Sequence, residues 1–326
     1  MTEQMKIGLI GYGGWPRTAY VPALHADGRS RVVAVAAPSE QTRARARSDL
    51  GDGVATYPDA ASMLAEAKVD ALMIAVAEHA HASAIGTAIE AALPVMYEPP
   101  LTDEVAATPA MVDKLIAARA PTHADIELSF LPVLDRLAAI VASGEIGVAR
   151  QAEVWLSSNW GASGQLCSAN HLAPWFIDPL DRVLDARAQR VLTLDGSANA
   201  AGAQPQCLAV LDYNGVWATF RSNNAASETT QIGVSVTGSS GEATADLMAG
   251  KLQIRTGEDW RTEGHSPIEP ILGLPGMHES VRRFLDAIEA GAEDPLAAGS
   301  ERLAALARLG LAIEESKLRG DWAVVS

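Results

Sequence analysis

Short runs of small and branched apolar residues alternate with helix-like segments along the first third of the chain. The unbroken apolar runs predict buried strands over residues 7–10, 32–36, 71–76 and 95–97. Helical patterns lie between and after them over residues 58–64, 82–92 and 103–118. Strands separated by helices of this length imply right-handed crossovers and a parallel sheet. The first third of the chain is therefore predicted to be a doubly wound α/β domain.

After about residue 124 the pattern changes to segments in which apolar and polar residues alternate. These strand-like segments cover residues 151–157, 207–213, 216–220, 232–237 and 242–247. Asn214-Gly215, between the second and third of them, is typical of the two-residue turn of a β-hairpin. The second part of the chain therefore predicts a large, mostly antiparallel, open sheet.

Helical patterns accompany this second sheet. One covers residues 131–143 and ends at Gly144, a typical C-terminal stop. Two amphipathic helices are expected near the end, over residues 279–289 and 300–318. We therefore expect two α/β domains, residues 1–123 with the parallel sheet and residues 124–326 with the antiparallel one.

Composition excludes some partners. The chain has 326 residues, of which 48% are hydrophobic and 20% charged, as in ordinary globular proteins. Its net charge of −15 argues against binding to a nucleic acid backbone or to an anionic membrane surface. We expect neither partner.

Other features indicate the cytoplasm. Cys167 and Cys207 are the two cysteines, too few for a disulfide scaffold, and we expect free thiols in a reducing compartment. The first strand begins close to Met1, so no signal peptide is expected. No apolar run approaches the ~20 residues of a spanning helix.

A glycine-rich turn directly follows the first predicted strand. Gly11 permits a tight turn, Gly13 allows a phosphate to approach the main chain, and a helix is expected to begin near Pro16. This strand–turn–helix pattern predicts a dinucleotide site whose expected residues are Gly11, Gly13, Gly14, Trp15, Pro16 and Arg17. The alternative is a turn of the same shape that binds nothing. Trp15 either packs over the coenzyme or partly obstructs it.

The end of the second strand bears on the choice of coenzyme. NAD-binding proteins usually carry an acidic residue there, and the matching position is Ala37. Without that carboxylate the candidate partners of a 2′-phosphate are Arg17, Ser39 and Arg43. The interpretation favours NADP slightly over NAD, with Glu40 as an alternative ribose ligand.

Further motifs follow in a characteristic order. They are Val69-Asp70-Ala71, His79-Ala80-His81, Glu98-Pro99-Pro100-Leu101, Phe130-Leu131-Pro132, Ser143-Gly144-Glu145-Ile146-Gly147 and Ile313-Glu314-Glu315-Ser316. With the glycine turn, they make the chain resemble the Gfo/Idh/MocA oxidoreductases. The resemblance implies a Rossmann domain, a nicotinamide coenzyme at the interface with the second domain, and a homodimer or homotetramer formed through the open sheet. It also implies coenzyme contacts from Ala75, Glu78, His81, Glu98 and Pro99.

The chain departs from the family pattern at two places. Pro99 stands where the family has the lysine of a Glu-Lys-Pro motif. The family's Asp-x-Gly-x-His-x-x-Asp pattern, aligned by its last residue, falls on Pro174, Phe176, Asp178 and Asp181. The candidate catalytic residues are Asp178, His171 and Asp181. Asp178 before Pro179 is also typical of a helix N-cap, and His171 of a capping or interface histidine.

These departures shape the expected function. We expect an NAD(P)-dependent oxidoreductase with non-standard proton delivery, acting on a small carbonyl or sugar-like compound or on an imine or conjugated one. A ketone needs both hydride and a proton, whereas a protonated imine needs little beyond the hydride. The alternative is a non-catalytic NAD(P)-bound sensor.

Trp155, Trp160 and Trp175 predict either aromatic walls of the site or ordinary packing. The His79 and His81 spacing does not suit a metal, and none is expected.

Overall fold

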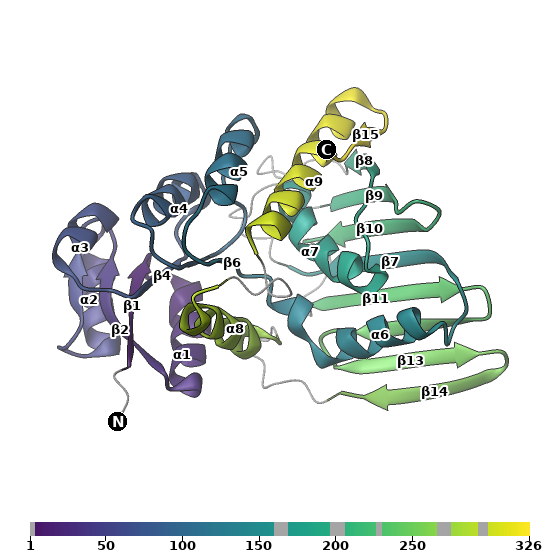
Figure 1. The fold of residues 1–326 in the computed structure, drawn as a ribbon, viewed down its shortest axis with the longest axis horizontal. Coiled ribbons are helices and arrows are strands. Elements are labelled where there is room, and N and C mark those ends of the chain that lie inside the picture. Colours follow the sequence, from purple (N-terminus) through teal and green to yellow (C-terminus); the bar gives the residue numbers. More distant parts are fainter. Residues whose placement is uncertain (1–3, 160–168, 196–205, 226–229, 266–274, 293–298) are drawn as a thin grey trace. The chain divides into compact units, whose positions relative to one another are not determined.

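The chain folds into two compact units. The computed structural model describes residues 4–159, 169–195, 206–225, 230–265, 275–292 and 299–326 (Figure 1). Unit 1 comprises Met1–Asp125 and Met277–Ala305, and unit 2 comprises Ile126–Gly276 and Leu306–Ser326.

Unit 1 is built on a parallel sheet of six strands in the order β3-β2-β1-β4-β5-β6. The strands are β1 (Met5–Ile10), β2 (Ser30–Ala36), β3 (Ala55–Tyr57), β4 (Ala71–Ile74), β5 (Val95–Tyr97) and β6 (Thr122–Ala124). All neighbouring pairs are parallel. The strand order reverses between β1 and β4, and this is the point at which doubly wound sheets bind ligands. The predicted doubly wound sheet is confirmed.

Helices connect these strands. They are η1 (Pro16–Tyr20), α1 (Val21–Asp27), α2 (Glu40–Leu50), α3 (Ala60–Glu66), η2 (Glu78–Ala80), α4 (His81–Glu90), η3 (Val105–Ala107) and α5 (Thr108–Ile116). Side chains cap two of them: Ser39 accepts from the amide of Thr42, and Asp59 from that of Ser62. Such caps satisfy amides that lack a partner within the helix, so these polar residues fix where α2 and α3 begin.

A late segment of the chain returns to unit 1. Arg29 binds Asp286 and Glu289 of α8 (Met277–Ala290), with nitrogen–oxygen distances of 2.8 and 2.9 Å. In addition, Nε2 of His123 lies 3.0 Å from the hydroxyl of Ser280. The two units therefore differ from the expected domains, residues 1–123 and 124–326. The difference arises because α8 packs with the unit of the parallel sheet.

Unit 2 contains a nine-stranded sheet in the order β14-β13-β12-β11-β7-β10-β9-β8-β15. Its strands are β7 (Ala149–Ser157), β8 (Arg190–Asp195), β9 (Gln206–Asp212), β10 (Trp217–Asn223), β11 (Gln231–Gly238), β12 (Gly241–Asp246), β13 (Lys251–Thr256), β14 (Asp259–Gly264) and β15 (Ala323–Val324). Among the described strands of this sheet, β7 and β10 are the pair that runs in parallel. The predicted hairpin is present: Asn214 and Gly215 have φ of 53° and 106°, the left-handed conformation that its turn requires. The predicted mostly antiparallel sheet is confirmed.

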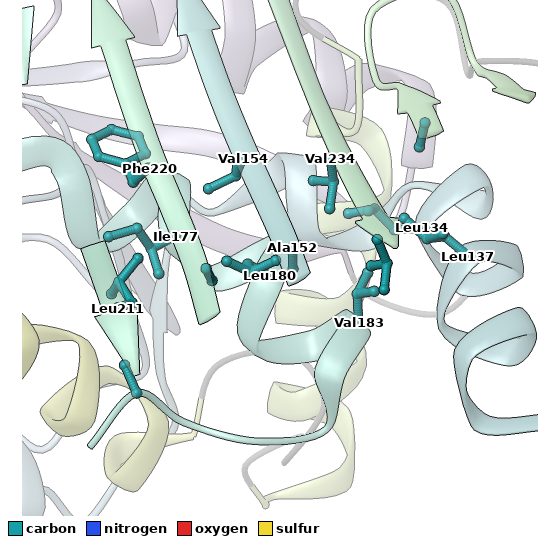
Figure 2. Close-up of a cluster of buried hydrophobic side chains, with 14 of the residues drawn as sticks. Leu134, Leu137, Ala152, Val154, Ile177, Leu180, Val183, Leu211, Phe220 and Val234 are labelled. Carbon is teal, nitrogen blue, oxygen red and sulfur yellow. The ribbon is translucent and has the colours of Figure 1, made fainter. Parts of the chain in front are cut away.

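Helices cover one face of this sheet. They include η4 (Glu127–Phe130), α6 (Pro132–Ser143), α7 (Ala169–Leu184) and the later part of α9 (Ser300–Arg319). Figure 2 shows Ile177, Leu180 and Val183 of α7 packed with strand residues such as Leu211 and Phe220. These side chains are almost fully buried, and their apolar area is the main source of stability in this unit. In the described part of the chain, no helix combines the length and apolar character needed to cross a membrane.

An ion-pair network ties the edge strand β14 to α6. The carboxylate of Glu263 accepts two hydrogen bonds from Arg136, at 2.8 and 3.0 Å, and one from Arg261 at 3.2 Å. Glu145 also binds Arg136, at 3.5 Å. The hydrogen bonds from Arg136, with the smaller contribution of Arg261, lower the pKa of Glu263 from 4.5 to about 2.

Replacing this carboxylate should weaken unit 2 in a pH-dependent way. Because the folded pKa of Glu263 is depressed, its contribution is complete above pH 4.5 and is lost as the pH falls towards about 2. We expect Glu263→Gln to lower the free energy of unfolding by about 1 kcal/mol at pH 7 and by less at pH 3, measured by urea unfolding. Glu258→Gln, an exposed change in the adjoining turn, is the matched control. A deficit that stays constant between these pH values contradicts the assignment.

Candidate functional site

The loop after β1 passes very close to the loop after β4. Gly11 has a φ of +91°, and a Cβ at this position would lie 2.0 Å from the carbonyl oxygen of Ala75. The amide of Gly11 donates to the carbonyl of Ala36 at 2.9 Å. A glycine is thus required for the two loops to meet at the switch point of the sheet.

The next glycines face open space. An added Cβ at Gly13 or Gly14 would meet no atom within 4 Å, and both residues are exposed. The fold itself therefore does not require glycine at these two positions. What glycine provides here is main-chain access for a ligand, which is its role in phosphate-binding turns.

The helix begins where the sequence predicted. Trp15 is the N-cap and Pro16 lies in the first turn of η1, a π-helix that continues into α1. Proline fits a first turn because its missing N–H has no helical acceptor there. Short π-helical turns are frequent at functional sites.

The Trp15 side chain is anchored just beyond the end of β6, the last strand in the order of the sheet. Its Nε1–H donates to Oδ2 of Asp125 at 2.9 Å, and Asp125 directly follows β6. Trp15 is half-buried, whereas Asp125 is buried. The indole therefore has a fixed position near the glycine turn.

Arg17 is held by α2. Its Nε donates to Oδ2 of Asp49 at 2.9 Å. Burial and the charge of Asp49, which also accepts a hydrogen bond from Tyr12, raise the pKa of Tyr12 to about 12. Arg17 thus lies between the glycine turn and α2, beside a neutral tyrosine.

The guanidinium of Arg43 lies at the end of β2, near Ala37. Ala37 is the position at which the usual acidic residue of NAD-binding proteins is missing. Nη1 of Arg43 donates to the carbonyls of Ala37 and Pro38, at 2.6 and 2.8 Å. Arg43 and Arg47 both bind the carboxylate of Glu40, and these two arginines, Arg47 the more strongly, lower its pKa. Ser39 caps α2. Two positive charges and one negative charge therefore gather at this strand end.

The remaining candidates in unit 1 follow β4 and β5. The carbonyl group of Ala75 lies against Gly11 of the glycine turn, as described above. Glu78 is the first residue of η2. His81 is buried, with Nδ1 2.6 Å from the carbonyl oxygen of Pro100 and Nε2 3.1 Å from that of Val76. It thereby connects the loops after β4 and β5.

Glu98 and Pro99 lie directly after β5 at the same edge of the sheet. The Tyr20 hydroxyl donates to Glu98 at 3.5 Å. Pro99 carries no group that can gain or lose a proton, so this strand end offers no lysine-type acid.

Asp178 and Asp181 lie inside α7. The helix spans Ala169–Leu184, so the hypothesis that Asp178 is an N-cap is wrong. The Ser129 hydroxyl donates to Asp178, and the Tyr213 hydroxyl donates to Asp181 at 2.5 Å. Each carboxylate thus has a hydroxyl donor from a different part of unit 2.

Sequence reasoning missed both hydroxyl donors. Burial and the nearby charges of Asp181 and Asp178 raise the pKa of Tyr213 well above 10, so this hydroxyl keeps its proton. Ser129 is 1% exposed and Asp178 also 1%, so their bond forms away from bulk water. The position of Tyr213 next to the Asn214-Gly215 turn was the only available sign of a fixed location.

Other predicted residues fall into separate places. His171 lies within α7, and its side chain is outside the described residues, as is Trp160. Trp175 is buried, while Trp155 lies against Gly233 of β11, on the sheet face opposite the buried Val154. Trp155 and Trp175, the two that the structure describes, therefore do not form one wall in unit 2. Among the described residues, no group of three or more His, Cys, Asp or Glu side chains is placed to hold a metal ion.

The strand order and the glycine turn give unit 1 the Rossmann fold that is typical of dinucleotide-binding proteins. Residues 5–126 match the model of an oxidoreductase family with an NAD-binding Rossmann fold, GFO_IDH_MocA. Over these residues the resemblance to the Gfo/Idh/MocA oxidoreductases predicted from the motifs is confirmed. A comparison with curated proteins finds no match.

Solved structures share the fold over the whole chain. An oxidoreductase domain protein from Kribbella flavida is 18% identical, with a TM-score of 0.84 and 99% of both chains covered. An oxidoreductase from Agrobacterium radiobacter in complex with NAD+, L-tartaric acid and magnesium is 17% identical, with a TM-score of 0.84 and 99% coverage of both chains. Levoglucosan dehydrogenase in complex with NADH and L-sorbose is 18% identical, with a TM-score of 0.84 and 100% coverage of both. At these identities the likeness concerns the fold.

Proposed function

We propose that this protein is an NAD(P)-dependent oxidoreductase that transfers hydride between the nicotinamide and a small-molecule substrate. The observation that carries the proposal is the glycine turn at the switch point. Gly11 is required by the fold, while Gly13 and Gly14 leave their main chain open to a ligand. The family match and the coenzyme complexes of two structural relatives support the same conclusion.

A side chain at Gly13 should weaken coenzyme binding strongly without unfolding the protein. Because an added Cβ there meets no protein atom within 4 Å, Gly13→Val should fold, yet its methyl groups would occupy the space of the diphosphate. We expect at least about a tenfold loss of NADPH and NADH affinity in fluorescence titrations. Gly53→Val, at a glycine with equally open surroundings and no positive φ, is the matched control. Equal binding by both variants, or no binding by the wild-type protein, would refute the proposal.

We propose NADP(H) as the preferred coenzyme. Arg43 is held at the end of β2 by the carbonyl oxygens of Ala37 and Pro38, and Ala37 matches the position where NAD-binding proteins carry a ribose-binding carboxylate. Glu40, the alternative ribose ligand, is already bound by Arg43 and Arg47. A guanidinium suits a phosphate, with which it forms charge-assisted hydrogen bonds.

Removing this guanidinium should change the choice of coenzyme. We expect Arg43→Ala to weaken NADPH binding about tenfold or more and to leave NADH binding nearly unchanged, because only NADPH carries the 2′-phosphate. Ala37→Asp should shift the preference further towards NADH. Arg45→Ala, an exposed arginine on the same helix, is the control. If the Arg43 and Arg45 variants lose NADPH affinity equally, α2 does not select the coenzyme through Arg43.

Proton delivery is proposed to be non-standard. Pro99 falls where the family has its lysine, and Asp178 falls where it has its histidine when the family pattern is aligned on Asp181. We propose Asp178 or His171 as the proton donor where one is needed, with Asp181 as its neighbour one turn along α7. Imines and conjugated substrates then compete with carbonyl and sugar-like ones, because hydride transfer to a cationic C=N bond needs no proton.

Asp178 should matter more for ketones than for iminium ions. Asp178→Asn is expected to reduce the kcat of ketone reduction about a hundredfold while sparing reduction of a quaternary iminium salt, since the hydride alone completes that reaction. Asp113→Asn, an exposed aspartate of α5, serves as control, and His171→Gln tests the other donor. An equal loss on both substrates argues against proton delivery by Asp178.

A second candidate is a non-catalytic NAD(P)-bound sensor. Pro99 favours it, because the family's usual lysine is missing. Coenzyme binding without turnover on a broad panel of carbonyls and imines would support this candidate.

The expected homodimer or homotetramer remains a proposal. Leu194, Leu208 and Trp217 support it, since they expose 55%, 40% and 45% of their surface on neighbouring strands of the second sheet.

A further inference from the structure

The Trp15 side chain reaches across the carboxyl edge of the parallel sheet. The last residues of β1, β4, β5 and β6 pair in register, so these four strand ends lie side by side. Neighbouring parallel strands are about 4.8 Å apart, which separates β1 from β6 by about 14 Å. Trp15 follows β1, yet its indole binds Asp125, which follows β6. The segment from the glycine turn to the indole therefore extends past the ends of β4 and β5.

Those strand ends belong to the second mononucleotide-binding half of the fold. In doubly wound sheets each half takes one mononucleotide, and the diphosphate crosses at the switch point. Arg43, at the end of β2, belongs to the half that takes the adenosine. The half formed by β4, β5 and β6 is then left for the nicotinamide nucleoside.

We propose that the Trp15 indole is a wall of the nicotinamide pocket and that Asp125 is the positioning residue that holds it there. This inference rests on the proposed coenzyme-dependent function. Trp15 is half-buried, so the residue is not fully enclosed by the protein. Flat aromatic rings stack with one another, and nicotinamide is a flat ring.

The role of Asp125 follows from its place and burial. It is 4% exposed, and its amide donates to the carbonyl of Tyr97 at 2.9 Å, which fixes the carboxylate at the end of β6. A hydrogen bond to a carboxylate is stronger than one between neutral groups. The indole is thus oriented before the coenzyme arrives, and this reduces the conformational cost of binding.

The test compares two ligands that differ only in the nicotinamide ring, which 2′-phospho-ADP-ribose lacks. NADPH and 2′-phospho-ADP-ribose are titrated into the full-length protein by calorimetry; the NADH and ADP-ribose pair replaces them if the wild type prefers NADH. Trp15→Leu should bind NADPH about tenfold more weakly and bind 2′-phospho-ADP-ribose nearly as the wild type does. Trp260→Leu, at a tryptophan of β14 that is 60% exposed, is the matched control and should leave both affinities unchanged.

Asp125 provides a pair of variants that test its positioning role. Asp125→Ala removes the acceptor and should lower NADPH affinity as Trp15→Leu does. Asp125→Asn keeps a carbonyl oxygen and should restore the wild-type affinity. The double variant Trp15→Leu with Asp125→Ala should lose no more than Trp15→Leu alone, because Asp125 acts through the indole. This pair carries the test if Trp15→Leu does not fold.

The outcomes separate this inference from the function on which it rests. Wild-type protein that binds neither ligand refutes the proposed function, and the inference with it. Wild-type binding with equal losses for the two ligands, or with unchanged NADPH affinity in the Trp15 and Asp125 variants, overturns the inference alone. Tighter NADPH binding by Trp15→Leu also overturns it, because the indole would then obstruct the coenzyme.

Discussion

The passage of Gly11 against the carbonyl of Ala75 is the contact on which the rest of the candidate coenzyme site depends. With 2.0 Å between an added Cβ and that oxygen, any side chain would push the loop after β1 away from the loop after β4. The contact fixes where the turn ends and where η1 begins. It thereby leaves Gly13 and Gly14 open and sends the Trp15 side chain across the sheet. One steric constraint thus sets both the access of a phosphate and the position of an aromatic ring.

Much of the fold could be predicted because its signals are local. Unbroken apolar runs predict the strands of a sheet that is covered on both faces, and Asn214-Gly215 predicts a hairpin from two residues. The edge strand β14 was not predicted, since nearly all its residues are exposed and no alternation marks it. The strand β6 contains Thr122 and His123, polar residues that are buried, so its composition conceals it. The amphipathic pattern of α8 predicts a helix, but it does not tell which sheet the helix covers.

The candidate site likewise combines a local feature that the sequence reveals with long-range contacts that it does not. The glycine turn lies within a few neighbouring residues, and the sequence shows it directly. The bonds that position side chains join distant residues: Ser129 and Asp178 are 49 residues apart, and Trp15 and Asp125 are 110 apart. No spacing rule connects such pairs. The Asp178-Pro179 pair also led to the wrong hypothesis of a helix N-cap, because proline occurs inside α7 and not only at a helix start.

The return of α8 to unit 1 has a consequence for how the protein is made. The partners of Arg29 on α8 are separated from it by 257 and 260 residues, and all of Ile126–Gly276 is translated between them. The parallel sheet can form early on the ribosome, but α8 emerges only after Ile126–Gly276 has been translated. Chains that terminate before Met277 would expose the surface that α8 covers, and such fragments are natural clients for chaperones and proteases.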